Sequence, residues 1–169
     1  FLQRSAVTLK GLTYAPTGAI AAAPTTSLPE TPGGERNWDY RYTWMRDATL
    51  TLWALYTLGF DVEANEFLYF ICDVASEGGE LQIMYGIDGR PDLTERVLDH
   101  LSGYEGARPV RVGNGAHSQA QHDVWGAVVS SIYLHVGHGR LDDRQWSLTV
   151  NLVQAAIAAW RGADRGMWE

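Results

Sequence analysis

Gly34-Glu35-Arg36-Asn37-Trp38-Asp39-Tyr40-Arg41-Tyr42-Thr43-Trp44-Met45-Arg46-Asp47 is the stretch that decides the fold, because it leads directly into the most apolar helical segment. It places two Trp, two Tyr, three Arg and two Asp within fourteen residues. Aromatic rings pack on the C–H faces of sugars, and guanidinium and carboxylate groups form charge-assisted hydrogen bonds to hydroxyls. The same composition also fits an ordinary aromatic core segment whose charges reach outward to solvent. From these residues alone, both interpretations stay open.

Composition and charge exclude several classes of protein. The 169 residues fit one domain or part of a larger one, and 46% hydrophobic with 20% charged residues indicates a globular chain. Thirteen Lys and Arg against twenty Asp and Glu give a net charge of −7, which argues against a nucleic-acid or anionic-membrane partner. No apolar run reaches the roughly 18 residues of a membrane span, and no signal peptide is visible. The single Cys72 excludes an internal disulfide and favours a reducing, cytoplasmic compartment.

Both ends of the sequence are unusual. The chain begins at Phe1 without a Met, and it stops just after a turn around Gly166, with Trp168 in the penultimate position. Natural termini more often end in small polar residues. We therefore expect a fragment, truncated at both ends, of a longer protein that is called the parent below.

Apolar periodicity predicts four main helices, at about 46–58, 62–76, 119–136 and 143–161. The first and third are apolar nearly all round, which predicts burial on every side. The second is amphipathic, which predicts a place on the outside. The fourth carries a stripe at 4-3-4-3 spacing, made of Trp146, Val150, Val153, Ile157 and Trp160. The alternation predicts an all-α fold of two layers of antiparallel helices.

The remaining segments are predicted to be short or irregular. A brief helix fits residues 1–12, and the prolines of 13–32 predict an extended loop. Alternation at 81–85 predicts a strand, and a short helical piece fits 92–101. A capping box of Ser118 and Gln121 is predicted to open the third helix. Asp61 and Asp142 are predicted to cap the starts of the second and fourth helices, and Gly59 is predicted to cap the end of the first.

Common catalytic motifs are missing from the sequence. The five histidines show no metal-ligand spacing and are interpreted as surface or helix-end residues, so no metal site is predicted. Gly113-Asn114-Gly115 lacks the Lys of a phosphate-binding loop. Ser130 and Ser131 lie inside an apolar helix and not in a nucleophile elbow.

Carboxylates are the remaining candidates. Asp47 and Asp123 each lie at the N-terminal end of an apolar helix, where the helix dipole favours an anion. Helix capping explains either residue equally simply, and for Asp47 taken alone it is the preferred interpretation. In a layered ring of helices, however, both ends could line one mouth. Glu169 follows Trp168, and an aromatic wall raises a carboxyl pKa, which suits a general acid.

Several long motifs occur in a shared order, and together they resemble glycoside hydrolase family 15. They are Gly34–Asp47, Leu98–Tyr104, Pro109–Asn114, Gln119–Asp123 and Gly166–Glu169. The family contains glucoamylases, glucodextranases and some bacterial trehalases, and the resemblance runs from about Arg4 to Glu169. Two segments look most like the bacterial trehalase and glucoamylase-like branch: 17–20 and 25–30.

The resemblance implies an (α/α)6 toroid, with residues 1–169 as the N-terminal part of a single catalytic domain and about the first half of the ring. It implies inverting hydrolysis of a terminal α-glucosidic bond, with release of β-glucose. In such a reaction one carboxylic acid protonates the leaving oxygen, and a second carboxylate activates water on the opposite face.

The resemblance also implies roles for particular residues. The family's general acid falls on Glu169, and its Arg-Asp pair, which holds the terminal glucose, falls on Arg46 and Asp47. Its stacking Tyr and substrate-lining Trp fall on Tyr40 and Trp44. Three more residues belong to substrate-binding motifs near the cleft, with their roles left open: Arg111, Gln121 and Asp123.

The general base of this family is a Glu in the C-terminal half, which this chain lacks, so we expect the fragment to be inactive. The alternatives are a non-catalytic carbohydrate-binding helical module and a purely structural helical scaffold. The substrate is expected to be an α-glucoside or α-glucan, and α-1,4-glucan, α-1,6-glucan and trehalose are not distinguished. No cofactor is predicted; a trehalase-like member could depend on phosphate or magnesium, although no residue here supports this. The oligomeric state is left open.

Overall fold

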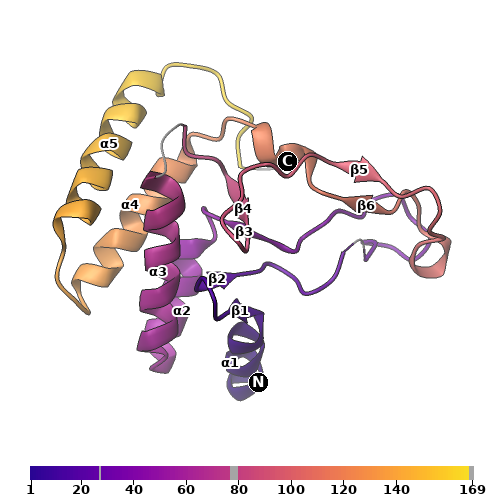
Figure 1. Ribbon diagram of the computed structural model, residues 1–169, viewed down its shortest axis with the longest axis horizontal. Helices are drawn as coiled ribbons and strands as arrows, with labels where there is room; N and C mark the ends of the chain where they lie inside the picture. Colours follow the sequence, from indigo (N-terminus) through magenta and orange to yellow (C-terminus); the bar gives the residue numbers. More distant parts are fainter. Residues whose placement is uncertain (27, 77–79, 168–169) are drawn as a thin grey trace.

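The structure is a computed structural model that describes residues 1–26, 28–76 and 80–167 (Figure 1). Within these ranges the α-helices are α1 (Leu2–Leu12), α2 (Ala48–Leu58), α3 (Asp61–Ser76), α4 (Asp123–Val136) and α5 (Asp143–Ala159). The strands form three antiparallel two-stranded ladders: β1 (Thr13–Tyr14) with β2 (Ala19–Ile20), β3 (Tyr42–Trp44) with β4 (Met84–Gly86), and β5 (Arg96–Val97) with β6 (Arg111–Val112). Two 3-10 helices are η1 (Tyr104–Gly106) and η2 (Gly115–Ser118).

Helices α2 to α5 form the body of the molecule, and β5–β6 extends from it as an arm (Figure 1). The core fills the space between these helices because α2, α3 and α4 all turn large apolar side chains inward. Its fully buried members include Leu52, Leu55, Phe67, Ile71 and Val128. The helical part of the fold prediction is therefore confirmed, and the short ladders are an addition to the all-α description.

Two predicted helix ends are confirmed. Gly59 closes α2 with a φ of 79°, in the left-handed region that glycine adopts without steric cost. Asp142 opens α5 through a capping box with Gln145, whose backbone N–H donates to the Asp142 carboxylate at 2.7 Å. No helix in the described part of the chain is both long and apolar enough to cross a bilayer.

The predicted capping box at Ser118 and Gln121 is wrong, because α4 begins only at Asp123. Ser118 instead ends η2, which the Asn114 side chain caps by accepting from the Ala116 N–H at 3.0 Å. Gln119 then adopts an extended conformation, with φ −77° and ψ 140°, so that one continuous helix cannot form. The predicted helix at 92–101 is also wrong, because β5 pairs there with β6, more than ten residues further along the chain.

The predicted burial of the helices is partly wrong. Leu50 and Trp53 on α2 and Tyr133 on α4 are exposed, so these helices are not buried on every side. On α5, Leu148 and Leu152 are buried, and the small residues Ala155, Ala156 and Ala159 pack against the core beside them. The predicted stripe is largely exposed, with Trp146, Val153, Ile157 and Trp160 all at least 44% accessible. The buried face of α5 thus carries small side chains, which allow helices to approach closely.

The opening stretch is held by β3. Its register against β4 pairs Tyr42 with Gly86 and Trp44 with Met84, so the predicted strand at 81–85 exists but is shifted toward the C-terminus. Trp44 and Met84 belong to a second small apolar cluster, which also contains Tyr42, Ile83, Leu93 and Ala116. This cluster fixes the backbone immediately before α2, and it thereby sets the position of the polar residues that follow.

Candidate functional site

A cavity of about 650 Å³ lies where the opening stretch meets the segments around β5 and η2. Its volume falls in the range of small-molecule sites, roughly 300–1,000 Å³. The opening stretch contributes six of the residues around it: Arg36, Trp38, Tyr40, Trp44, Arg46 and Asp47. The other lining residues are Ala22, Glu30, Glu95, Asn114, Gly115, Ala116, Gln119 and Met167. A second cavity, of about 530 Å³, contains none of those six residues and is therefore a weaker candidate.

Two aromatic rings form one wall of the cavity. The ring centroids of Tyr40 and Trp44 lie 5.7 Å apart and the planes are tilted by 40°. Trp44 is only 7% exposed, whereas Tyr40 is 39% exposed. The backbone between them is fixed, because the carbonyls of Tyr40 and Tyr42 accept from the N–H groups of Ala23 and Ala22, both at 2.9 Å. The wall is therefore preformed and offers an aromatic surface to a ligand.

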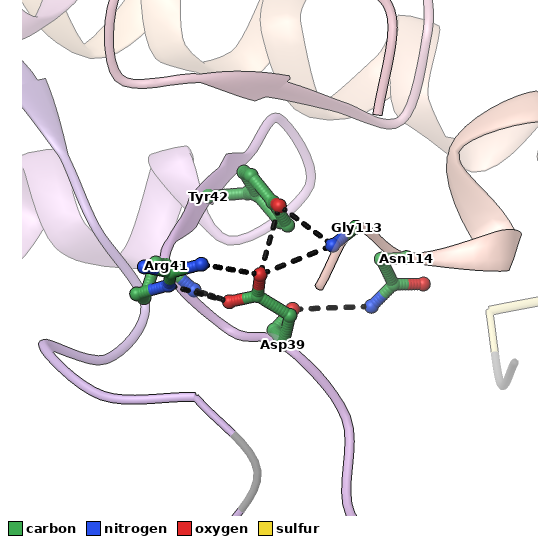
Figure 2. Close-up of polar contacts among 5 residues, drawn as sticks. All are labelled: Asp39, Arg41, Tyr42, Gly113 and Asn114. Atoms are coloured by element: carbon green, nitrogen blue, oxygen red, sulfur yellow. Dashed lines mark hydrogen bonds and ion pairs between the residues drawn. The ribbon is translucent and has the colours of Figure 1, made fainter. Parts of the chain in front are cut away.

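Buried Asp39 lies directly before this wall, and Figure 2 shows its polar contacts. Its carboxylate accepts from Nε and Nη2 of Arg41, both at 2.9 Å, from the Tyr42 hydroxyl at 2.8 Å and from the Gly113 N–H at 3.2 Å. The Asn114 side chain also donates to the Asp39 carbonyl at 3.4 Å. Burial raises the pKa of Asp39, but the hydrogen bonds from Arg41 and Tyr42 outweigh it and hold the pKa below its usual value. Asp39 therefore joins the aromatic wall to the turn after β6.

Arg46 and Asp47 lie together at the start of α2. Arg46 Nη1 donates to Gln121 Oε1 at 2.9 Å and to the Met167 carbonyl at 2.7 Å, and Nη2 lies 3.7 Å from Asp47 Oδ2. Asp47 is the N-cap residue, but its side chain makes no capping hydrogen bond. The capping interpretation is therefore wrong for its carboxylate, which is 59% exposed and lines the cavity. Gln121 does not line this cavity but orients Arg46.

Arg111 lies behind the cavity lining and not in it. Its Nη1 donates to the carbonyls of Asn37 at 2.7 Å and Glu35 at 3.2 Å, and its Nε lies 3.2 Å from Glu95 Oε1. The guanidinium thus fixes the first residues of the opening stretch and one acidic residue of the opposite segment. In the structure Arg111 supports the site and does not form its surface.

Two predicted residues are placed differently. Asp123 is the first residue of α4, is exposed and does not line the cavity. Glu169 lies outside the described residues, as does Trp168. Met167, the last described residue, lines the cavity, and its carbonyl is bound by Arg46. Among the described residues no group of three or more His, Cys, Asp or Glu side chains is placed to hold a metal ion.

Sequence reasoning did not single out Asp39, Glu95 or Trp38. Asp39 and Arg41 stand two residues apart, and this spacing of an acid and an arginine is the local signal of the ion pair that the structure shows. The role of Glu95 depends on contacts with Arg111 and Gly115, sixteen and twenty residues along the chain, which have no local signature.

Comparison with known proteins identifies the family. Residues 1–169 match glycosyl hydrolases family 15 over their whole length, so the chain belongs to this family. Its relatives include the trehalase of Mycolicibacterium smegmatis, 58% identical over 174 residues, and that of Mycobacterium tuberculosis, 57% identical over 174 residues. Each match covers 100% of this chain and 26% of the relative. The trehalase of Thermoplasma acidophilum is 44% identical over 99% of this chain and 29% of its own length.

The chain thus spans only about a quarter of the length of these curated relatives. No solved structure gives a significant match. The family resemblance seen in the sequence is confirmed, and the homology is to trehalases.

Proposed function

We propose that this chain is the first part of the catalytic domain of a trehalase-like inverting hydrolase, and that the complete domain is an (α/α)6 toroid. The observation that carries the proposal is the cavity that combines Tyr40 and Trp44 with Arg46 and Asp47. An aromatic wall packs on one face of a glucose ring, and the guanidinium–carboxylate pair binds its neighbouring hydroxyls. Trehalose is the preferred substrate because the relatives at 57–58% identity are named trehalases.

In this proposal Glu169 is the general acid. It would donate a proton to the glycosidic oxygen while a carboxylate from the rest of the parent activates a water molecule on the other face of the sugar. The bond from Arg46 to the Met167 carbonyl supports this, because it holds the chain two residues before Glu169 at the cavity wall. A second hydrogen bond also holds this segment in place, since the Arg165 N–H donates to the Ala120 carbonyl at 3.0 Å.

The proposal assigns separate tasks to the described residues. Tyr40 and Trp44 bind the terminal glucose by packing, Arg46 and Asp47 bind its hydroxyls, and Gln121 orients Arg46. Arg111 acts from behind the cavity lining by holding the opening stretch. Because an inverting hydrolase needs two carboxylates on opposite faces of the sugar, the 169-residue chain alone is expected to bind sugar without hydrolysing it.

The test is glucose release from trehalose, maltose and isomaltose by the purified parent and by the 169-residue chain. We expect the parent to act best on trehalose and the chain to release no glucose. Arg46→Ala in the parent should lower kcat/KM about ten- to a hundredfold, because charge-assisted hydrogen bonds are lost. Arg90→Ala, which removes an exposed arginine outside this cavity, is the control and should stay within about twofold.

Two results would contradict the proposal. Glucose release by the isolated chain would show that it needs no further carboxylate. A parent that binds trehalose without cleaving any of the three sugars would favour the non-catalytic carbohydrate-binding module instead.

A further inference from the structure

We propose that Glu95 binds hydroxyls of the second sugar of the substrate, the one that leaves, and so makes the site selective for a disaccharide such as trehalose. This inference rests on the proposed function. It concerns a residue that belongs to none of the motifs identified from the sequence and that the structure places in the cavity lining.

Two fixed donors hold the Glu95 carboxylate at the cavity. Its Oε1 lies 3.2 Å from Arg111 Nε, and its Oε2 accepts from the Gly115 N–H at 3.3 Å. The side chain is 29% exposed, so it is largely packed in place while part of it still faces the cavity. A carboxylate restrained through both oxygens loses little conformational freedom when a ligand binds, which favours affinity.

The carboxylate still has the capacity to accept from a ligand. A carboxylate has about four lone-pair positions, and the two described donors occupy one on each oxygen. Sugar hydroxyls are suitable donors for the others. Nearby, Gln119 also lines the cavity and brings an amide group that can both donate and accept. The chemistry of this wall therefore fits a polyhydroxyl ligand.

Glu95 belongs to a different wall from the Arg46–Asp47 pair. Arg46 and Asp47 lie at the start of α2, whereas Glu95 directly precedes β5 in the arm. When Arg46 and Asp47 hold one sugar ring, a second ring of the same ligand can contact Glu95. A cavity of about 650 Å³ is large enough for a small-molecule ligand that reaches both walls.

Arg111 links the Glu95 wall to the segment that leads into the aromatic wall of Tyr40 and Trp44. The guanidinium that pairs with Glu95 through Nε also donates through Nη1 to the Asn37 carbonyl at 2.7 Å, in the segment that leads to Tyr40. The distance between the Glu95 wall and the aromatic wall is therefore set by one planar guanidinium group, whose donors point in fixed directions. A fixed separation is what a site needs to select a ligand of two rings.

The experiment compares two substrates in the parent. Trehalose offers hydroxyls on its leaving group, whereas a 4-nitrophenyl α-glucoside offers none there. Glu95→Gln removes the charge and half of the acceptor capacity but keeps the shape of the side chain. We expect kcat/KM for trehalose to fall about tenfold, the loss of one charge-assisted hydrogen bond, and kcat/KM for the aryl glucoside to stay within about twofold.

The control variant is Asp73→Asn, which removes a carboxylate that also pairs with an arginine, Arg144, but lies outside this cavity. It should leave both substrates unchanged. Equal losses on the two substrates in Glu95→Gln would assign Glu95 a merely structural role, and no loss on either would exclude it from substrate binding; both results overturn the inference while the proposed function stands. Failure of the unaltered parent to hydrolyse trehalose would instead overturn the proposed function and the inference with it.

Discussion

Replacing Asp39 by Ala should destabilise the chain strongly, because the Asp39 carboxylate is fully buried and accepts several hydrogen bonds. Asp39 is 0% exposed, and Ala would remove the acceptor of the Arg41 guanidinium, the Tyr42 hydroxyl and the Gly113 N–H at once. The Arg41 side chain is 44% exposed and can regain water, so its loss costs little. Gly113 keeps a second acceptor, the Tyr42 hydroxyl oxygen at 3.0 Å.

The main cost comes from the Tyr42 hydroxyl. Tyr42 is only 3% exposed, and without Asp39 its hydroxyl hydrogen loses a charged acceptor at 2.8 Å in a place that water does not reach. An unsatisfied buried donor costs about 1–3 kcal/mol, and hydrogen bonds to charged groups are at the upper end of such values. With the weaker contribution of Arg41, we expect a loss of about 3 kcal/mol, a large part of the 5–15 kcal/mol typical of a domain.

The assay is urea unfolding of the chain at pH 7, followed by tryptophan fluorescence. Asp88→Ala is a matched control, because Asp88 and Arg90 have the same two-residue spacing. Both of these side chains are more than half exposed, and the distance from Arg90 Nη1 to Asp88 Oδ2 is a longer 3.4 Å. The control should lose less than about 1 kcal/mol. If Asp39→Ala and Asp88→Ala lose the same amount, the reasoning from burial and hydrogen bonding is refuted.

Two further predictions concern the helical body. Cys72 is 1% exposed and burial raises its thiol pKa to about 11, so a disulfide reagent at pH 8 should modify it only as fast as the chain unfolds; immediate labelling in the folded state would contradict its burial. His135 contacts the Tyr56 hydroxyl through Nδ1 at 2.9 Å, and burial lowers its pKa from 6.5. The unfolded chain then binds more protons below pH 6.5, so stability should fall as the pH drops through this window, by at most about 1.4 kcal/mol per pH unit for this group. His135→Gln should weaken that pH dependence in unfolding experiments, and an unchanged dependence would contradict the assignment.

The sequence allowed the helices and the polar stretch to be predicted because both have local signals. Apolar runs without charge gave α2 and α4 to within a few residues, and Asp142 with Gln145 marked the start of α5. The cluster of Trp, Tyr, Arg and Asp was compatible with a ligand site or with an ordinary aromatic core segment, and several of its members line a cavity.

The features that sequence analysis missed depend on long-range contacts. The 4-3-4-3 stripe on α5 marks an apolar face, but α5 buries a different face, with Leu148 and Leu152 in the core and alanines packed beside them. Residues 92–101 were predicted to be helical because the ladder of β5 with β6 has no local signature. The anchoring of Asp39 by Gly113 spans 74 residues, so local patterns do not reveal it.

The most direct test of the central claim is anomer-resolved proton NMR of trehalose hydrolysis by the parent. Both glucose units of trehalose have the α configuration, so inversion at one of them should release α- and β-glucose in equal amounts before mutarotation, and Arg46→Ala should slow both equally. Initial release of α-glucose alone, or no release, would contradict the proposal that this chain carries sugar-binding residues of an inverting hydrolase.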